Sequence, residues 1–212
     1  MTDWRKLAPK DIERRSMEII ESELGEVPFE GIERIVLKRV IHTTADLGYA
    51  ETLFFSPDAA QKGIEALIGG ADIVTDTNMA KSGINKAALA KLGCRVHCFM
   101  ADERVAEKAA KLGVTRASVS MEAAAEIDKP LIIAVGNAPT ALLRLAELIG
   151  EKKIEPKLII AAPVGFVNVV ESKRIIEGCG VPVICARGRK GGSTVAAAIC
   201  NALAYEAVKL KD

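Results

Sequence analysis

Short apolar runs alternate with segments of helical spacing from Glu51 to the C-terminus, and this alternation limits the chain to few folds. The apolar runs predict strands near residues 51–55, 72–76, 94–100, 131–136, 158–162 and 182–186. The segments between and after them predict helices near residues 58–69, 85–92, 102–112, 138–150, 168–178 and 193–208. Such alternation is typical of successive βαβ units. Because their crossovers are right-handed, we expect an α/β protein whose parallel sheet carries helices on both faces.

Two further helices are predicted before this alternating part. Pro9 suits a first helical turn, and apolar residues recur at helical spacing as far as about Leu24. A break at Gly25 and Pro28 precedes a second helix over about residues 30–46. We expect this pair to pack across one end of the sheet or against another subunit. With no internal repeat, low-complexity stretch or linker, the 212 residues predict a single domain, 1–212.

Charge and composition exclude several classes of protein. Lys plus Arg number 29 and Asp plus Glu number 28, so nothing indicates a bulk attraction to nucleic acid or to an anionic membrane. The first residues contain no apolar signal-peptide run, and no apolar run approaches the ~18 residues of a membrane span. The five cysteines lie mostly in apolar runs, which favours reduced, buried thiols over disulfides. We therefore expect a soluble cytoplasmic protein.

The helix predicted over residues 30–46 carries two side chains suited to chemistry. Arg39 lies within a stripe of apolar residues, and His42 lies close to its edge. Because burying an unpaired charge is costly, an inward Arg39 needs an acidic partner in the protein or on a ligand. Two interpretations fit: an internal salt bridge with a core histidine, or an active site. Ser16, on the apolar face of the first helix, either bonds the carbonyl one turn back or belongs to that site.

Four predicted strand ends carry glycines, helix caps and cations. Ligands of open parallel sheets bind beyond the carboxyl ends of the strands, so chemistry is expected in these loops. They are Asp76–Gly83, Gly136–Thr140, Pro163–Asn168 and Arg187–Thr194. The helix N-termini behind them offer free N–H groups and partial positive charge, which suit an anionic ligand. The last loop lacks the residue order of a P-loop, and no G-x-G-x-x-G follows the first strand, so a nucleotide is disfavoured.

Individual residues of these loops admit simpler interpretations. Asn137 is expected to cap the helix that follows its strand, with Pro139 in the first turn. Ordinary turn chemistry explains any one loop, whereas four loops at one edge favour a binding site. Arg116, just before another helix, is either a surface arginine or a second anion clamp.

A metal site has little support in the sequence. Cys94, His97 and Cys98 lie on one predicted strand, where the two cysteines share a face and the histidine points to the other. No second pair of cysteines or histidines supplies the remaining ligands of a zinc site. We therefore expect no structural metal.

Seven motifs occur in the order and at the spacing of a known family. They are Pro9…Ile12-Glu13…Ser16, Arg39–His42 with Asp46, Asp76…Met79…Gly83-Ile84, Thr115-Arg116, Gly136–Leu142, Pro163–Val167 with Glu171–Lys173, and Lys190–Ser193. Together they resemble the precorrin-8X methylmutase family of cobalamin biosynthesis, also called cobalt-precorrin-8 methylmutases. The resemblance covers essentially the whole chain, and the fifth and sixth motifs are distinctive individually.

This resemblance implies an isomerase that moves a methyl group between adjacent carbons of ring C of a large tetrapyrrole. Precorrin-8X would give hydrogenobyrinate, and cobalt-precorrin-8 would give cobyrinate; the macrocycle would hold the cobalt, so the protein carries no ligand signature for it. The resemblance also implies a flavodoxin-like fold and a homodimer with active sites near the subunit interface. The next enzyme of the pathway is a candidate partner, to which the product could be handed over. Because methyl migration within a conjugated ring needs no external donor, we expect no cofactor.

Roles for the candidate residues combine the resemblance with their chemistry. We hypothesise that His42 is the general acid toward the ring system, and that Arg39 orients it or pairs with a substrate carboxylate. Met79 and Phe166 would line an apolar slot for the macrocycle. The remaining substrate-binding residues would be Ser16, Arg116, Asn137, Thr140, Gly165, Lys190, Gly191, Gly192 and Ser193.

The alternative is a non-catalytic flavodoxin-like module that binds a flavin or another anionic ligand at the same loops. Such a module would bind the nucleotide and would have no use for His42. A third possibility is a family member that carries a corrinoid without turnover, against which the presence of His42 argues.

Overall fold

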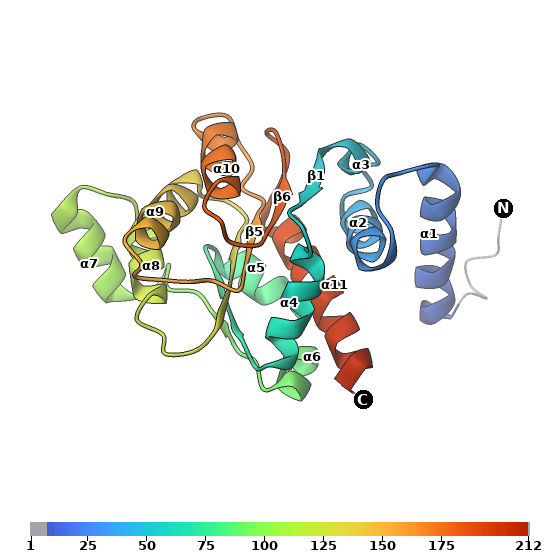
Figure 1. The fold of residues 1–212 in the computed structure, drawn as a ribbon, viewed down its shortest axis with the longest axis horizontal. Coiled ribbons are helices and arrows are strands. Elements are labelled where there is room, and N and C mark those ends of the chain that lie inside the picture. The colour runs from blue at the N-terminus through green and yellow to red at the C-terminus, as the bar shows by residue number, and fades with distance from the viewer. Residues whose placement is uncertain (1–7, 212) are drawn as a thin grey trace.

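The computed structural model describes residues 8–211, which form a mixed α/β fold with a six-stranded sheet and eleven helices (Figure 1). The strands are β1 (Leu53–Phe55), β2 (Asp72–Thr75), β3 (Val96–His97), β4 (Leu131–Val135), β5 (Leu158–Ala161) and β6 (Val183–Ala186). The helices are α1 (Pro9–Leu24), α2 (Gly31–Thr44), α3 (Tyr49–Thr52), α4 (Ala59–Ile68), α5 (Asn78–Gly83), α6 (Lys86–Leu92), α7 (Glu103–Leu112), α8 (Arg116–Ala124), α9 (Pro139–Gly150), α10 (Val169–Glu177) and α11 (Ser193–Lys211). None of the helices in residues 8–211 is long and apolar enough to cross a membrane.

The sheet has the strand order β1-β6-β5-β4-β2-β3. The strands from β6 to β3 pair in parallel, as expected. β1 instead pairs antiparallel with β6, with Leu53 opposite Ala186. The prediction of a parallel sheet is therefore wrong for its first strand. The backbone N–H of Arg187, just past the end of β6, donates to the carbonyl of Thr52, just before β1, so β1 starts at the carboxyl edge and runs back from it.

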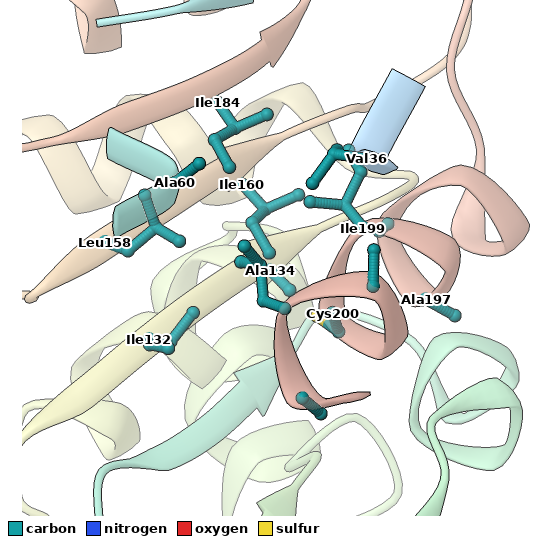
Figure 2. Packing of buried hydrophobic residues seen from close by; sticks show 14 of the residues in the cluster. Val36, Ala60, Ile132, Ala134, Leu158, Ile160, Ile184, Ala197, Ile199 and Cys200 are labelled. Atoms are coloured by element: carbon teal, nitrogen blue, oxygen red, sulfur yellow. The ribbon is translucent and has the colours of Figure 1, made fainter. Parts of the chain in front are cut away.

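Both faces of the sheet are buried, as its continuous apolar strands predicted. In β5, Leu158 and Ile160 pack against α2, α4 and α11 on one face (Figure 2). Ile159 and Ala161 pack against α8, α9 and α10 on the other face. Full burial of an isoleucine side chain contributes about 1.5–3 kcal/mol. Covering both apolar faces of the sheet requires a helical layer on each side. Figure 1 shows α8 and α9 on one side of the sheet and α4, α6 and α11 on the other.

Local hydrogen bonds explain where the elements differ from expectation. The segment expected as a loop after β2 is helix α5, because the Thr77 side chain caps it by accepting the N–H of Ala80 (3.0 Å). The strand predicted near 94–100 is reduced to β3. The N–H of Arg95 donates to the Asp72 side chain (2.9 Å), so a side chain takes the place of a strand partner there.

Candidate functional site

The carboxyl ends of β2, β4, β5 and β6 meet at one edge of the sheet. We call the loops there, residues 76–79, 136–140, 163–168 and 187–193, the strand-end rim. Asp76 is buried and organises two of them: Oδ1 accepts the N–H of Gly136 (2.7 Å), and Oδ2 accepts those of Asn137 (2.8 Å) and Ala138 (2.7 Å). Burial raises the pKa of Asp76, and the three N–H donors oppose that rise. One carboxylate thus ties the loop after β4 to the end of β2.

The loop after β6 lies closely against the same edge. The N–H of Gly192 donates to the carbonyl of Ala162 (2.8 Å), and Ser193 Oγ lies 2.8 Å from Thr77 Oγ1. Gly191 has a φ of +156°, and a Cβ built there would collide with the Ala162 carbonyl oxygen. A Cβ on Gly136 would lie 2.6 Å from the Cα of Ser193. Glycine at both positions is therefore required by the close approach of two backbones.

We expect Gly191→Ala to lower the free energy of unfolding by about 2–3 kcal/mol, because the new Cβ forces the loop away from Ala162. Gly188→Ala is the matched control: Gly188 also has a positive φ (+72°), but no atom lies within 4 Å of a Cβ there. Only backbone strain of about 1–2 kcal/mol is expected at residue 188. Urea unfolding of both variants measures the difference, and equal losses would contradict the packing of residue 191 on the strand end.

Asn137 does not cap the helix after β4, contrary to the prediction. Ala138 occupies the N-cap of α9 without a side-chain cap, and Pro139 begins the helix as predicted. The Asp76 carboxylate already accepts the N–H groups of residues 136–138. The exposed side chain of Asn137 is therefore left for other partners.

The other predicted rim residues surround this framework. Thr140 Oγ1 lies 2.8 Å from Thr115 Oγ1, which brings Arg116, exposed at the start of α8, beside the loop after β4. Met79 and Phe166 are 68% and 82% exposed. Gly165 donates its N–H to the carbonyl of Arg189 (3.2 Å), joining the loops after β5 and β6. Cations, hydroxyls and exposed apolar side chains therefore gather at one edge.

A second cluster lies on α1, α2 and α11, around a pocket of about 790 Å³ that we call the helical pocket. Its lining residues are Ile12, Glu13, Ile35, Arg39, His42, Ala202, Tyr205, Glu206 and Lys209. Arg39 Nη1 donates to Glu13 Oε1 (2.8 Å), and the guanidinium lies 5.4 Å from the centre of the Tyr205 ring. An imidazole, a guanidinium and a carboxylate thus share one open pocket.

The expectation that Arg39 and His42 face the core is wrong. α2 buries a stripe formed by Val36, Leu37, Val40 and Ile41. The Arg39 side chain beside this stripe is 26% exposed, and His42 is exposed. The acidic partner that Arg39 was predicted to need is present as Glu13. The Glu13 side chain is 53% exposed, so this is not the internal salt bridge of the first interpretation, and His42 is not a core histidine.

Ser16 makes the simpler of its two predicted contacts. Its hydroxyl donates to the carbonyl of Ile12 one turn back on α1 (2.9 Å). Ser16 therefore lies one helical turn after Ile12 and Glu13, which line the helical pocket, and does not line the pocket itself.

The end of α2 connects the helical pocket to the strand-end rim. Lys190 Nζ donates to Asp46 Oδ2 (2.7 Å), and this hydrogen bond lowers the pKa of Asp46. Along α11, however, Ala202 in the pocket follows Ser193 at the rim by nine residues, roughly 13 Å of helix. One chain thus groups the rim residues and leaves His42, Arg39 and Ser16 outside that group.

The residues predicted to be unsuited to metal binding make structural contacts at the opposite edge of the sheet. His97 Nε2 lies 2.8 Å from Asp72 Oδ2, and Lys129 Nζ donates to Asp72 Oδ1 (2.7 Å). The Cys94 thiol donates to the carbonyl of Leu67 (3.3 Å). Within residues 8–211, no three His, Cys, Asp or Glu side chains are grouped so that they could hold a metal ion.

The sequence-based set of site residues lacks Glu13, Asp46 and Asp76. The signal for Asp76 is its place between a buried strand and a capped turn, where a carboxylate needs several donors. The signal for Glu13 and Asp46 is their place in the first two family motifs, whereas local spacing gives none, because their partners lie 26 and 144 residues away in the sequence.

The fold and the two clusters define an α/β protein that places cations, hydroxyls and exposed apolar side chains at one edge of its sheet and in a neighbouring helical pocket. The sequence model of the precorrin-8X methylmutase family matches residues 11–206, so the chain belongs to that family of isomerases. The family resemblance predicted from the motifs is confirmed.

Individual relatives agree with this assignment. The chain is 43% identical over 204 residues to the cobalt-precorrin-8 methylmutase of Priestia megaterium, covering 95% of this chain and 91% of that protein. It is 38% identical over 188 residues to the precorrin-8X methylmutase of Pseudomonas aeruginosa, covering 88% and 89%. The structure of precorrin-8X methylmutase from Thermus thermophilus matches with a TM-score of 0.85 and 38% identity, covering 93% of this chain and 98% of that one. These relatives favour a methylmutase over a flavin-binding module.

Proposed function

We propose that this protein moves a methyl group between adjacent carbons of ring C of precorrin-8X, giving hydrogenobyrinate, or of cobalt-precorrin-8, giving cobyrinate. Membership of the methylmutase family over residues 11–206 is the observation that carries this proposal. Relatives named for each form of the substrate match at 38–43% identity, so both forms belong in the assay.

The proposed reaction is an isomerisation, so its atoms balance within the substrate. The bond from the methyl group to one ring carbon breaks, and a bond to the neighbouring carbon forms. His42 donates a proton to the conjugated ring system as the methyl group migrates, and it takes a proton back as the product forms. Imidazole suits this role because it gains and loses a proton near neutral pH. Exposure of His42 in an open pocket supports the role, since the macrocycle must reach it.

The substrate carboxylates are proposed to contact both clusters. Arg116 and the side chain of Asn137 form no ion pair or hydrogen bond with other described residues, so carboxylates can reach them directly. Arg39 is paired with Glu13 and Lys190 with Asp46, so a substrate carboxylate must share each cation with its protein partner. Met79 and Phe166 would cover the apolar face of the ring.

The strand order supports a flavodoxin-like arrangement. Counting β2 as the first parallel strand gives the order 2-1-3-4-5, which is that of flavodoxin-like sheets. Ligands of such sheets bind where the strand order reverses, here between β2 and β4, beside Asp76 and Asn137. Since all described strands share one sheet, we infer a single domain over residues 1–212.

Absorption spectroscopy tests the proposed function directly. Purified protein mixed with precorrin-8X is expected to produce the hydrogenobyrinate spectrum, and the same assay with cobalt-precorrin-8 is expected to produce that of cobyrinate. If neither tetrapyrrole is converted, the proposed reaction is wrong. Binding of a flavin instead would favour the module.

We further propose a homodimer in which each active site takes residues from both subunits. Ile12 and Ile19 on α1 are 50% and 44% exposed, and Phe166 and Val167 on the rim are 82% and 77% exposed. Two separate apolar surfaces on one chain suit a two-fold dimer, because pairing one surface with the other buries both twice. Such pairing would also bring the helical pocket of one subunit to the rim of its partner.

Mixed dimers test this arrangement. His42→Ala and Asn137→Asp are each expected to lose turnover, the second because its carboxylate repels those of the substrate. Unfolding and refolding the two variants together should restore about a quarter of wild-type activity, since half of the dimers contain one intact shared site. No recovery would place His42 and Asn137 of one active site in the same subunit.

The state of the cysteines bears on where the protein is located. All five cysteines are unpaired, and three of them, Cys94, Cys185 and Cys200, are buried, which supports a reducing cytoplasm. We also propose that the product passes to the next enzyme of the pathway, since an open site on the surface allows direct transfer.

A further inference from the structure

Lys173 is a fully buried cation without a carboxylate partner. It lies on α10, is 1% exposed, and forms no ion pair with any residue that the structure describes. Its ammonium instead donates to two backbone carbonyls, those of Gly188 and Lys190, both at 2.9 Å. Because burying a charge is costly, a lysine held this way indicates that these two carbonyls must be fixed.

Both carbonyls belong to the loop after β6, which reaches across to α2. The side chain of Lys190 pairs with Asp46 Oδ2 at 2.7 Å, and Asp46 Oδ1 accepts the N–H of Gly48 at 2.9 Å. A Cβ on Gly48 would lie 2.7 Å from Lys190 Nζ, so glycine there leaves room for the ammonium. One continuous set of contacts therefore runs from α10 through the loop to the end of α2.

Asp46 is connected closely to the turn of α2 that carries His42. Ala45 ends the helix in the left-handed conformation (φ +52°), and its N–H donates to the carbonyl of Ile41 at 2.7 Å. Asp46 follows immediately, and its own N–H donates to Thr44 Oγ1 at 3.3 Å. Fixing the Asp46 side chain thus restricts the backbone of the last turn of α2, which carries His42.

We propose that Lys173 is a positioning residue that, through the loop after β6 and the Lys190–Asp46 pair, holds in place the last turn of α2, which carries His42. The catalytic meaning of this linkage rests on the proposed function, whereas the linkage itself does not. In the proposed dimer, a tetrapyrrole whose carboxylates are held at the partner's rim would then present ring C to His42 in one orientation. A displacement of about 1 Å at such a distance from the chemistry can cost about 100-fold in rate.

Hydrogen/deuterium exchange tests the linkage without any substrate. In Lys173→Met, amides of residues 187–192 and of residues 42–49 are expected to exchange about tenfold faster, because two bonds to a charged donor are lost. Asp46→Asn should accelerate residues 42–49 to a similar extent while leaving the contacts of Lys173 in place. Arg174→Met is the matched control, since Arg174 is the exposed neighbour on α10 and forms no ion pair with the described residues. It should change neither segment.

Activity measurements separate positioning from substrate binding. Lys173→Met and Asp46→Asn are both expected to lower kcat at least about tenfold, because the turn that carries the imidazole moves after the substrate has bound. Asp46→Asn should change KM less than about threefold, whereas Lys173→Met should also raise KM, because it loosens the proposed substrate-binding residues 190–192. Arg174→Met should retain wild-type kcat. If KM rises in these variants while kcat stays unchanged, the contacts from Lys173 to Asp46 serve substrate binding, and the positioning role is wrong.

The exchange measurements test whether Lys173 is coupled to the end of α2 independently of the activity measurements. If Lys173→Met speeds exchange at residues 187–192 but not at residues 42–49, the proposed coupling between Lys173 and the end of α2 is wrong. If that variant does not fold, Asp46→Asn and Lys190→Met carry the test, and unchanged exchange at residues 42–49 in both refutes it. Lack of turnover by the wild-type protein would instead refute the proposed function and leave the exchange result standing.

Discussion

His42→Ala is expected to lower the rate of methyl migration by about 10²–10⁴-fold, the usual contribution of a general acid, while the corrinoid still binds. The side chain is exposed on the wall of the helical pocket and makes no hydrogen bond with the described residues, so its removal should leave the fold intact. In the proposed site, substrate affinity is expected to come mainly from cations and hydroxyls elsewhere in the two clusters. Stopped-flow absorption with precorrin-8X gives the rate, and titration with hydrogenobyrinate gives the affinity.

His97→Gln is the matched control, because the chain has only two histidines. His97 bonds Asp72 at the opposite edge of the sheet, so the glutamine variant should keep its turnover and lose only some stability. Wild-type rates in His42→Ala would contradict the assignment of the general acid. A loss of affinity with an unchanged rate at saturating substrate would show that His42 only binds the substrate, equally well before and during the reaction.

The fold could be predicted largely because burial dominates it. Strands such as β4 and β5 are buried on both faces, so their sequences are continuously apolar and stand out. The direction of β1 could not be predicted, since the three residues Leu53–Phe55 look the same in either direction. Helix α5 was missed because it has six residues and depends on one side-chain cap at Thr77.

The face that α2 buries shows a different limit of sequence analysis. Apolar residues lie on more than one side of this helix, and Ile35 is 38% exposed whereas Leu37 is fully buried. Packing against α11 decides between these faces, and helical periodicity alone does not. The position of His42 followed from that choice, so its exposure could be found only from the tertiary structure.

The strand-end rim was predictable in outline and unpredictable in detail. Its loops were found because the carboxyl ends of parallel strands gather at one edge, which is a rule of topology. The contacts that fix them, such as Lys190 with Asp46, join residues far apart in the sequence and leave no local pattern. Asp76 lies between these cases, since a carboxylate directly after a buried strand already indicates a need for donors.

Asp76→Ala is expected to lower the free energy of unfolding by about 4 kcal/mol, because three backbone N–H groups lose their acceptor together. Each bond to a charged group contributes about 1.5–3 kcal/mol, and the loss is partly offset because a buried carboxylate is no longer desolvated. The same change frees the loop of residues 136–140, so KM should rise as Asn137 and Thr140 lose their positions. Urea unfolding measures the first effect and steady-state kinetics the second.

Asp102→Ala is the control that separates the effect of a buried carboxylate, such as Asp76, from the effect of an ordinary helix cap. Asp102 also accepts a backbone N–H at a helix start, that of Arg104 (2.9 Å), but its side chain is 24% exposed and it belongs to none of the rim loops. Its loss should therefore be much smaller than that of Asp76 and should leave KM unchanged. Equal losses at the two positions would mean that Asp76 is no more than a cap, and the rim would then need another residue to hold the loop after β4. A large loss at residue 76 alone would mean that one buried carboxylate both stabilises the fold and aligns the proposed substrate-binding side chains, so stability and substrate affinity cannot be altered independently at that position.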